Sequence, residues 1–124
     1  MAYTTLTAIV RGDTAIYDLA ITSNGVPLDL AGALIWFTAK HRRTDADSAA
    51  IFQKRSDTGG IVVNAPTTLG TAVVTLNAID TVSLSAAHDV NLWFDVKIRD
   101  ANGVQSTPIY GYLPVVIDVT NNSS

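Results

Sequence analysis

The sequence has 124 residues, a mass of 13.1 kDa, a formal net charge of −3 at pH 7, 48% apolar residues and only 15% charged residues. These values fit one globular domain rather than a disordered chain, and the lack of cysteine excludes disulfides and thiolate metal sites. The acidic balance argues against a nucleic-acid binder, and we expect neither a membrane span nor a signal peptide, because polar residues interrupt every apolar run.

Residue usage favours strands over helices along the chain. All eleven acidic residues are Asp and none is Glu, a good helix former, while the β-branched residue threonine occurs fifteen times. The first strands are expected at residues 3–10 and 14–22, the second with alternating polar and apolar side chains. Asn24 and Gly25 then supply a tight turn, because both residues tolerate a positive φ.

Residues 33–41 predict a central strand that is apolar on both faces over its first half. Ile35 and Phe37 share one face, and Leu34 and Trp36 share the other. A strand in a two-layer sandwich needs only one buried face. Leu34 and Trp36 therefore either lie under a covering loop or form a surface for another chain, and both alternatives stay open.

The second half of the chain continues the strand pattern. Strands are expected at residues 51–56, 61–63, 71–77, 91–99 and about 108–119, with a helical turn within residues 78–87. The clearest is 91–99, in which Leu92, Phe94, Val96 and Ile98 alternate with Trp93, Asp95, Lys97 and Arg99. Pro114 suggests an edge position or a bulge. Short strands with turns at intervals of about 8 to 12 residues are typical of an all-β sandwich or barrel.

An ordered series of short motifs runs along nearly the whole chain. It comprises Arg11-Gly12-Asp13-Thr14, residues 25–33, Phe37-Thr38-Ala39-Lys40, Gly59-Gly60-Ile61, residues 76–84, Phe94-Asp95-Val96, residues 99–104 and residues 115–120. The series resembles the small immunoglobulin-like (Ig-like) domains of tailed bacteriophages that are similar to the N-terminal domain of the baseplate upper protein. Each motif is turn chemistry or strand patterning, so their order carries the resemblance.

The resemblance implies both a fold and a role. The fold would be an Ig-like β-sandwich of about seven to eight antiparallel strands over residues 1–120, followed by a tail at 121–124. The role would be that of a non-enzymatic structural protein of the virion, made in the bacterial host cytoplasm and bound to other virion proteins and to copies of itself. The phage relative continues into a long C-terminal region, which this sequence lacks, so a baseplate or tail adaptor and a capsid decoration module are both expected positions.

Apolar, aromatic and basic side chains are the candidate contact residues of such a protein. They are Leu34, Trp36, Lys40, Arg42, Arg43, Trp93 and Tyr112. The basic group is either a solvated face or part of an interface, and an exposed Trp would be an anchor for a partner subunit or a sugar ring. The alternative function is therefore a carbohydrate-binding or host-adhesion module that contacts a host-surface glycan.

The remaining short motifs have structural interpretations. Arg11-Gly12-Asp13 spells an integrin-binding tripeptide, but its position at a strand entrance predicts turn chemistry. His41 and His88 are expected to be solvated or capping residues, and Asp45 and Asp47 to lie in a solvated loop rather than a calcium site, since the other ligands of a calcium loop are missing. The sequence contains no nucleophile elbow, phosphate loop or zinc-helix motif, so we expect no enzymatic activity, no metal and no cofactor.

Overall fold

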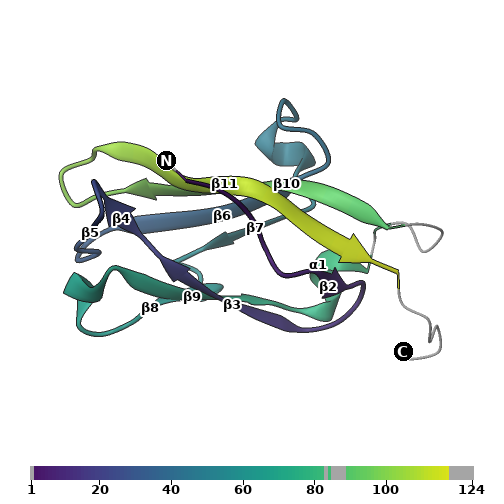
Figure 1. Ribbon diagram of the computed structural model, residues 1–124, viewed down its shortest axis with the longest axis horizontal. Coiled ribbons are helices and arrows are strands. Elements are labelled where there is room, and N and C mark those ends of the chain that lie inside the picture. Colours follow the sequence, from purple (N-terminus) through teal and green to yellow (C-terminus); the bar gives the residue numbers. More distant parts are fainter. Residues whose placement is uncertain (1, 83, 85–88, 118–124) are drawn as a thin grey trace.

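The computed structural model describes residues 2–82, 84 and 89–117, which form two main β-sheets stacked in layers (Figure 1). The larger sheet contains β1 (Ala2–Thr5), β2 (Ile9–Val10), β6 (Leu34–Lys40), β7 (Phe52–Arg55), β10 (Val90–Arg99) and β11 (Gln105–Val116). The smaller sheet contains β3 (Ala15–Ala20), β8 (Ile61–Val63) and β9 (Thr71–Leu76). This β-sandwich-like arrangement confirms the all-β prediction.

Within each sheet the strand order departs from the order along the chain. The larger sheet runs β1-β11-β10-β6-β7, with β2 also paired to β11, and the smaller runs β3-β9-β8. A separate hairpin joins β4 (Thr22–Ser23) to β5 (Val26–Pro27) through Asn24 and Gly25, whose φ angles are 54° and 79°. The turn predicted at these two residues is confirmed, since both adopt the left-handed conformation that such a turn requires.

Three short helical segments connect strands in the described residues. They are η1 (Asp47–Ala49), η2 (Thr67–Leu69) and α1 (Ala78–Thr81), the first two being 3₁₀ turns. The helical turn expected within residues 78–87 is present as α1, and a capping box between Asn77 and Asp80 satisfies backbone N–H groups at its start. The two 3₁₀ turns have no signal in the hydrophobic pattern.

The core lies between the two sheets and follows the alternation of their strands. On β10 the residues Leu92, Phe94, Val96 and Ile98 are buried, as predicted. Phe37 of β6 stacks between Phe52 and Phe94, with ring centroids 5.9 and 5.3 Å apart. Since one face of β6 and β10 is committed to this core, their other residues point outward and are free to form a surface.

Two features of the predicted topology are wrong. The family resemblance predicts antiparallel strands, but β1 and β2 pair in parallel with β11. Parallel neighbours need a long crossover connection, and here the chain passes through the opposite sheet between β2 and β11. The described residues contain eleven strands rather than seven or eight. A strand of only two residues, such as Ile9–Val10, is too short to produce an alternating hydrophobic pattern in the sequence. The expected tail at 121–124 lies outside the described residues.

Pro114 is in the interior of the larger sheet rather than at its edge. It pairs with Asn91 of β10 on one side. On the other side, the pairing of β1 ends at Tyr112 and that of β2 starts at Val115, so Pro114 falls in the gap between them. The proline is tolerated because its missing N–H coincides with a break in the neighbouring strand.

Candidate functional site

The outer face of the larger sheet carries a regular grid of polar and aromatic side chains. Across the β6–β10 pair, Trp93 lies opposite Lys40, Asp95 opposite Thr38, and Lys97 opposite Trp36. Directly opposed residues of an antiparallel pair point to the same face, so these six side chains lie together on the side away from the core. The strands thus fix their positions without help from loops.

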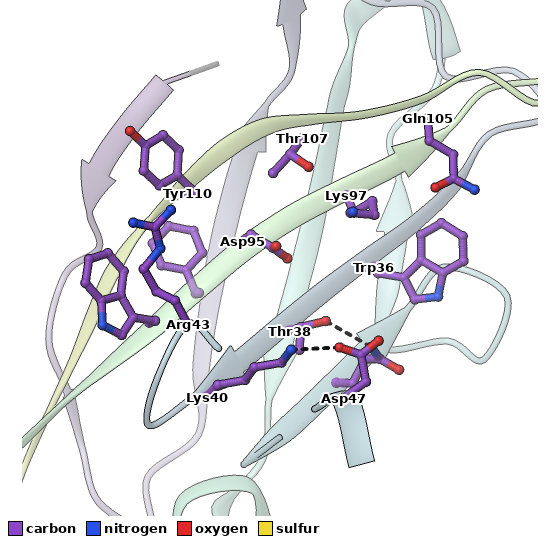
Figure 2. Close-up of a pocket in the computed structure, with 13 residues that line it drawn as sticks. Trp36, Thr38, Lys40, Arg43, Asp47, Asp95, Lys97, Gln105, Thr107 and Tyr110 are labelled. Atoms are coloured by element: carbon purple, nitrogen blue, oxygen red, sulfur yellow. Dashed lines mark hydrogen bonds and ion pairs between the residues drawn. The ribbon is translucent and has the colours of Figure 1, made fainter. Parts of the chain in front are cut away.

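This face is hollowed into an open trough of about 690 Å³ (Figure 2). Its lining includes Trp36, Thr38, Asp95, Lys97, Gln105 and Tyr110. Figure 2 shows Trp36 at one end, Tyr110 and Arg43 at the other, and Asp95 and Lys97 between them. The trough combines aromatic ends with a polar middle, so it offers both stacking surfaces and hydrogen-bonding groups to a ligand.

Stacked aromatic and guanidinium groups form one end of the trough. The rings of Trp93 and Tyr112 have centroids 4.1 Å apart and an interplanar angle of 38°. The Arg43 guanidinium carbon lies 5.0 Å from the Trp93 ring centroid and 5.9 Å from that of Tyr110. These distances fit cation–π contacts, so the cluster holds a positive charge beside exposed aromatic surface.

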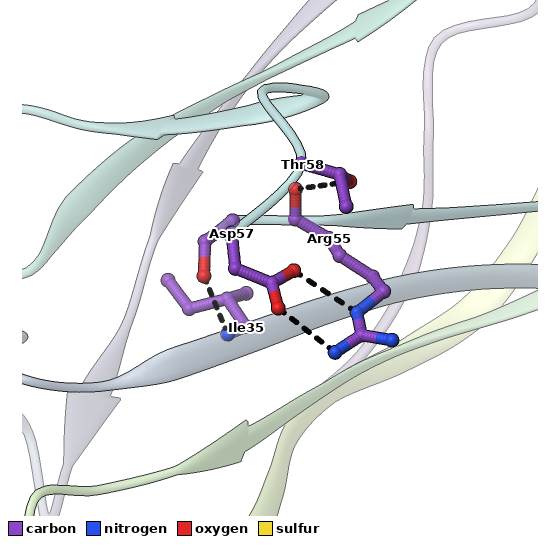
Figure 3. Close-up of polar contacts among 5 residues, drawn as sticks. Ile35, Arg55, Asp57 and Thr58 are labelled. Atoms are coloured by element: carbon purple, nitrogen blue, oxygen red, sulfur yellow. Dashed lines mark hydrogen bonds and ion pairs between the residues drawn. The ribbon is translucent and has the colours of Figure 1, made fainter.

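Two arginines flank Trp36 at the opposite end. The guanidinium carbons of Arg55 and Arg99 lie 6.0 and 5.9 Å from the Trp36 ring centroid. Arg55 is itself held by Asp57 through two hydrogen bonds of 3.0 and 2.9 Å, and Thr58 donates its hydroxyl to the Arg55 carbonyl (Figure 3). The turn after β7 therefore fixes one of the two cations beside Trp36.

Lys40 ties the loop after β6 to the edge of the trough. Its ammonium group lies 2.8 Å from an Asp47 carboxylate oxygen and donates to the Asp45 carbonyl over 2.7 Å. The hydrogen bond from Lys40, together with its charge, lowers the pKa of Asp47. The Asp45 carboxylate in turn accepts from the Arg42 backbone N–H. Asp45 and Asp47 thus make contacts within their own loop and with Lys40. Within the described ranges, no group of three or more potential metal ligands occurs.

Asp95 lies at the centre of the trough, half buried on β10. Among the residues described, its carboxylate has no hydrogen-bond or ion-pair partner. Burial raises the pKa of Asp95, and the nearby positive charges of Lys97 and Lys40 oppose that rise. Water has only limited access to this half-buried carboxylate. A ligand that donated hydrogen bonds to it would therefore stabilise its charge.

Four of the seven candidate contact residues line the trough. They are Trp36, Lys40, Arg43 and Trp93. The other three flank it: Tyr112 stacks on Trp93, Leu34 lies opposite Arg99 at the end of β6, and Arg42 is exposed in the loop. Leu34 and Trp36 are both half-buried, and the guanidinium groups of Arg55 and Arg99 lie near the Trp36 ring.

Several trough residues were not singled out from the sequence. The alternation of 91–99 already placed Asp95 and Lys97 on the same face as Trp93, so that signal was available. Tyr110 and Asp47 had no such signal, because the first depends on the β10–β11 register and the second on the fold of a loop.

The Arg11-Gly12 part of the integrin-like tripeptide makes internal contacts. Arg11 donates from Nε to the Leu84 carbonyl over 2.8 Å and from a terminal nitrogen to the Val82 carbonyl over 2.6 Å. The Gly12 N–H donates to the hydroxyl of Thr81 over 2.8 Å. These bonds attach the turn to the end of α1, which supports the turn interpretation. His41 is exposed, and His88 lies outside the described residues.

The sequence matches no protein-family model and no curated protein. Within the described part of the chain, no helix is long and apolar enough to cross a membrane. Function is therefore inferred from the residues of the trough and from the surfaces around it.

Proposed function

We propose that this chain is an Ig-like structural module of a tailed-bacteriophage particle, made in the bacterial host cytoplasm and assembled by protein–protein contacts. The order of the strands supports the Ig-like part of the proposal. Taking β3, β6, β7, β8, β9, β10 and β11 as strands B, C, C′, D, E, F and G gives a G-F-C-C′ sheet opposite a B-E-D sheet. That division matches the Ig variable-type arrangement of the central strands.

The observation that carries the assembly role is the grouping of all the apolar contact candidates on one outer face. Leu34 and Trp36 are two residues apart on β6 and so share its outer face. Trp93 and Tyr112 form a stacked pair on β10 and β11. Partly exposed aromatic side chains are favoured anchors at protein interfaces. Next to them, β7 pairs with β6 on one side only, so its other edge offers backbone groups for strand addition.

Mass spectrometry of purified phage particles tests the proposal. We expect the chain in the particle at a fixed ratio to a known structural protein, as a baseplate or tail adaptor or as a capsid decoration module. Its consistent absence from particles would overturn the assignment. Trp93→Ala particles should lose the chain while Ile16→Ala particles keep it, because Ile16 is exposed on the other sheet.

A second function, a carbohydrate-binding or host-adhesion module, is favoured by one specific observation. The trough places a row of polar side chains between aromatic groups, and sugar rings present both hydroxyl groups and apolar C–H faces. A glycan array probed with the folded chain tests this function directly. A blank array would exclude it and leave the assembly role unaffected.

A further inference from the structure

Basic residues are concentrated on the outer face of the larger sheet, although the protein as a whole is acidic. Six of the eight basic residues lie on this face or in the loop at 41–51 that borders it, with three of the eleven acidic residues. The basic residues are Lys40, Arg42, Arg43, Arg55, Lys97 and Arg99. A net charge of −3 for the chain thus coexists with a locally positive surface, which attracts anions to the trough.

Several of these cations make no ion pair with the described residues. Among the described residues, Lys40 and Arg55 lie within ion-pair distance of carboxylates, but Arg43, Lys97 and Arg99 do not. Arg43 and Arg99 instead lie over aromatic rings. Cations held over the walls of a trough are available to a carboxylate or phosphate that enters it.

The middle of the trough carries a negative charge, the Asp95 carboxylate, which can accept hydrogen bonds. The half-buried Asp95 carboxylate accepts no hydrogen bond from the described residues, and Thr38 already receives one from Gln53 over 3.0 Å. A ligand that fits must therefore bring hydrogen-bond donors to Asp95 as well as negative charge to Lys97. Hydroxyl groups beside a carboxylate or phosphate meet both conditions.

The aromatic side chains set the length of the site. Lys97 lies opposite Trp36, and Trp93 is four residues from Lys97 along β10, so the backbones of the two tryptophans are separated by about 13 Å along the strand direction. Aromatic groups at both ends of such a span suit a ligand of more than one ring whose apolar faces stack at each end.

From these three features we propose that the trough binds an acidic oligosaccharide, one whose rings carry carboxylate or phosphate groups. This inference rests on the carbohydrate-binding function above and names its ligand class. Lys97 and Arg43 contact the acidic groups, Asp95 accepts hydrogen bonds from ring hydroxyls, and Trp36 and Trp93 stack on the rings. Single-stranded DNA is the main competitor, since it also combines negative charge with stacking. Its backbone lacks free hydroxyl groups for Asp95, which favours the saccharide.

The first experiment presents the full chain to an array of acidic and neutral bacterial polysaccharides, with an oligo(dT) strand as a separate probe. We expect binding to acidic members that weakens as salt is added. Equal binding to neutral members would overturn the acidic class and keep the carbohydrate function, whereas a blank array from folded protein would exclude both. Tighter binding to oligo(dT) than to any saccharide would replace the proposal with a nucleic-acid site.

The second experiment locates the site by calorimetric titration of the best acidic saccharide. Lys97→Gln and Asp95→Asn should each weaken binding about tenfold, the loss expected for one charge-assisted hydrogen bond. Lys97→Arg should bind close to wild type because it keeps the charge. Asp18→Asn is the matched control for Asp95→Asn, since Asp18 is exposed on the other sheet. Unchanged affinity in Lys97→Gln and Asp95→Asn, with both variants folded, would show that the ligand binds elsewhere.

Discussion

Gly111 packs so closely against Thr4 that a Cβ atom at residue 111 would lie 1.7 Å from the Thr4 carbonyl oxygen. The two residues are direct partners in the parallel pairing of β1 with β11. The φ angle of Gly111 is 155°, a value that other residues rarely adopt. Glycine at this position is thus what allows the first strand to join the sheet.

Replacing this glycine should detach β1 from the sheet. We expect Gly111→Ala to lower the free energy of unfolding by about 3 kcal/mol, because the obstructing atoms belong to backbone that cannot rotate away. Chemical denaturation followed by tryptophan fluorescence measures the loss. Gly25→Ala is the control: its Cβ would meet open space, so only the positive φ costs energy, about 1 kcal/mol. Equal losses in the two variants would contradict the steric argument.

The burial of the central strands could be predicted from the sequence because it depends only on backbone geometry. Successive side chains of a strand point to opposite faces, so the alternation in 91–99 fixed which residues of β10 face the core. The same rule placed Ala72, Val74 and Leu76 of β9 inward. Asn24 and Gly25 were equally predictable, since few residues adopt positive φ.

The trough could not be predicted, because it depends on how separate strands align. Asp95 lies opposite Tyr110 only because of the β10–β11 register, which shifts between Val96 and Ile98. Asp47 reaches the trough through a loop that Lys40 holds in place. The parallel β1–β11 pairing joins residues about one hundred positions apart, and no local pattern encodes such a contact.

The hydroxyl of Thr81 should contribute more to the free energy of unfolding than its methyl group. Thr81 is fully buried, and its Oγ1 accepts the Gly12 N–H. Thr81→Val keeps the shape but leaves this N–H without a partner, which should lower the free energy of unfolding by about 2 kcal/mol. Thr81→Ser keeps the hydroxyl and should lose about 1 kcal/mol through the missing methyl. Thermal unfolding of both variants checks the order, and a smaller loss in the valine variant would contradict it.

The Asp95 carboxylate should lower the free energy of unfolding when it is ionised at neutral pH but not when it is protonated in acid. Burial holds its folded-state pKa above the ordinary 3.8, so its contribution to stability is complete below pH 3.8 and is lost as the pH rises through the folded-state pKa. Asp95→Asn removes this titration and should gain stability at pH 7, by less than about 1 kcal/mol because water screens a half-exposed carboxylate. Denaturation midpoints at pH 7 and below 3.8 measure the gain, which should vanish in acid.

Comparing wild type with Asp95→Asn separates the effect of Asp95 from that of Asp47, the other acid of the trough whose pKa is shifted. The lowered pKa of Asp47 acts with the opposite sign: its contribution is present above pH 3.8 and is lost as the pH falls through its folded-state pKa. Wild type and Asp95→Asn both contain Asp47 and Lys40, the main cause of its shift, so most of its effect cancels in their difference. A difference between the two proteins that is constant with pH would show that ionisation of Asp95 is not its cause.

The ion pair of Lys54 with Asp80 should stabilise the fold more than the neighbouring pair of Arg55 with Asp57. The first spans 2.7 Å with side chains only 16% and 11% exposed, and it joins β7 to α1. The second spans 2.9 Å, but its side chains are 41% and 49% exposed. Lys54→Met leaves the Asp80 charge poorly solvated and should lower the free energy of unfolding by about 3 kcal/mol. Arg55→Met should cost less than about 1 kcal/mol, because water solvates Asp57 in its place.

A second substitution shows whether the lost charge pairing is the cause. In the Lys54→Met protein, changing Asp80 to Asn removes the unpaired charge while keeping a side-chain oxygen for the Asn77 N–H that Asp80 accepts. The double variant should therefore recover part of the stability lost by Lys54→Met alone, which denaturant titration of the four proteins in the cycle measures. Additive losses would mean that Lys54 acts through packing of its methylene groups against Gly60 instead. These groups lie so close to Gly60 that a Cβ atom built on it would be 3.0 Å from Lys54 Cδ.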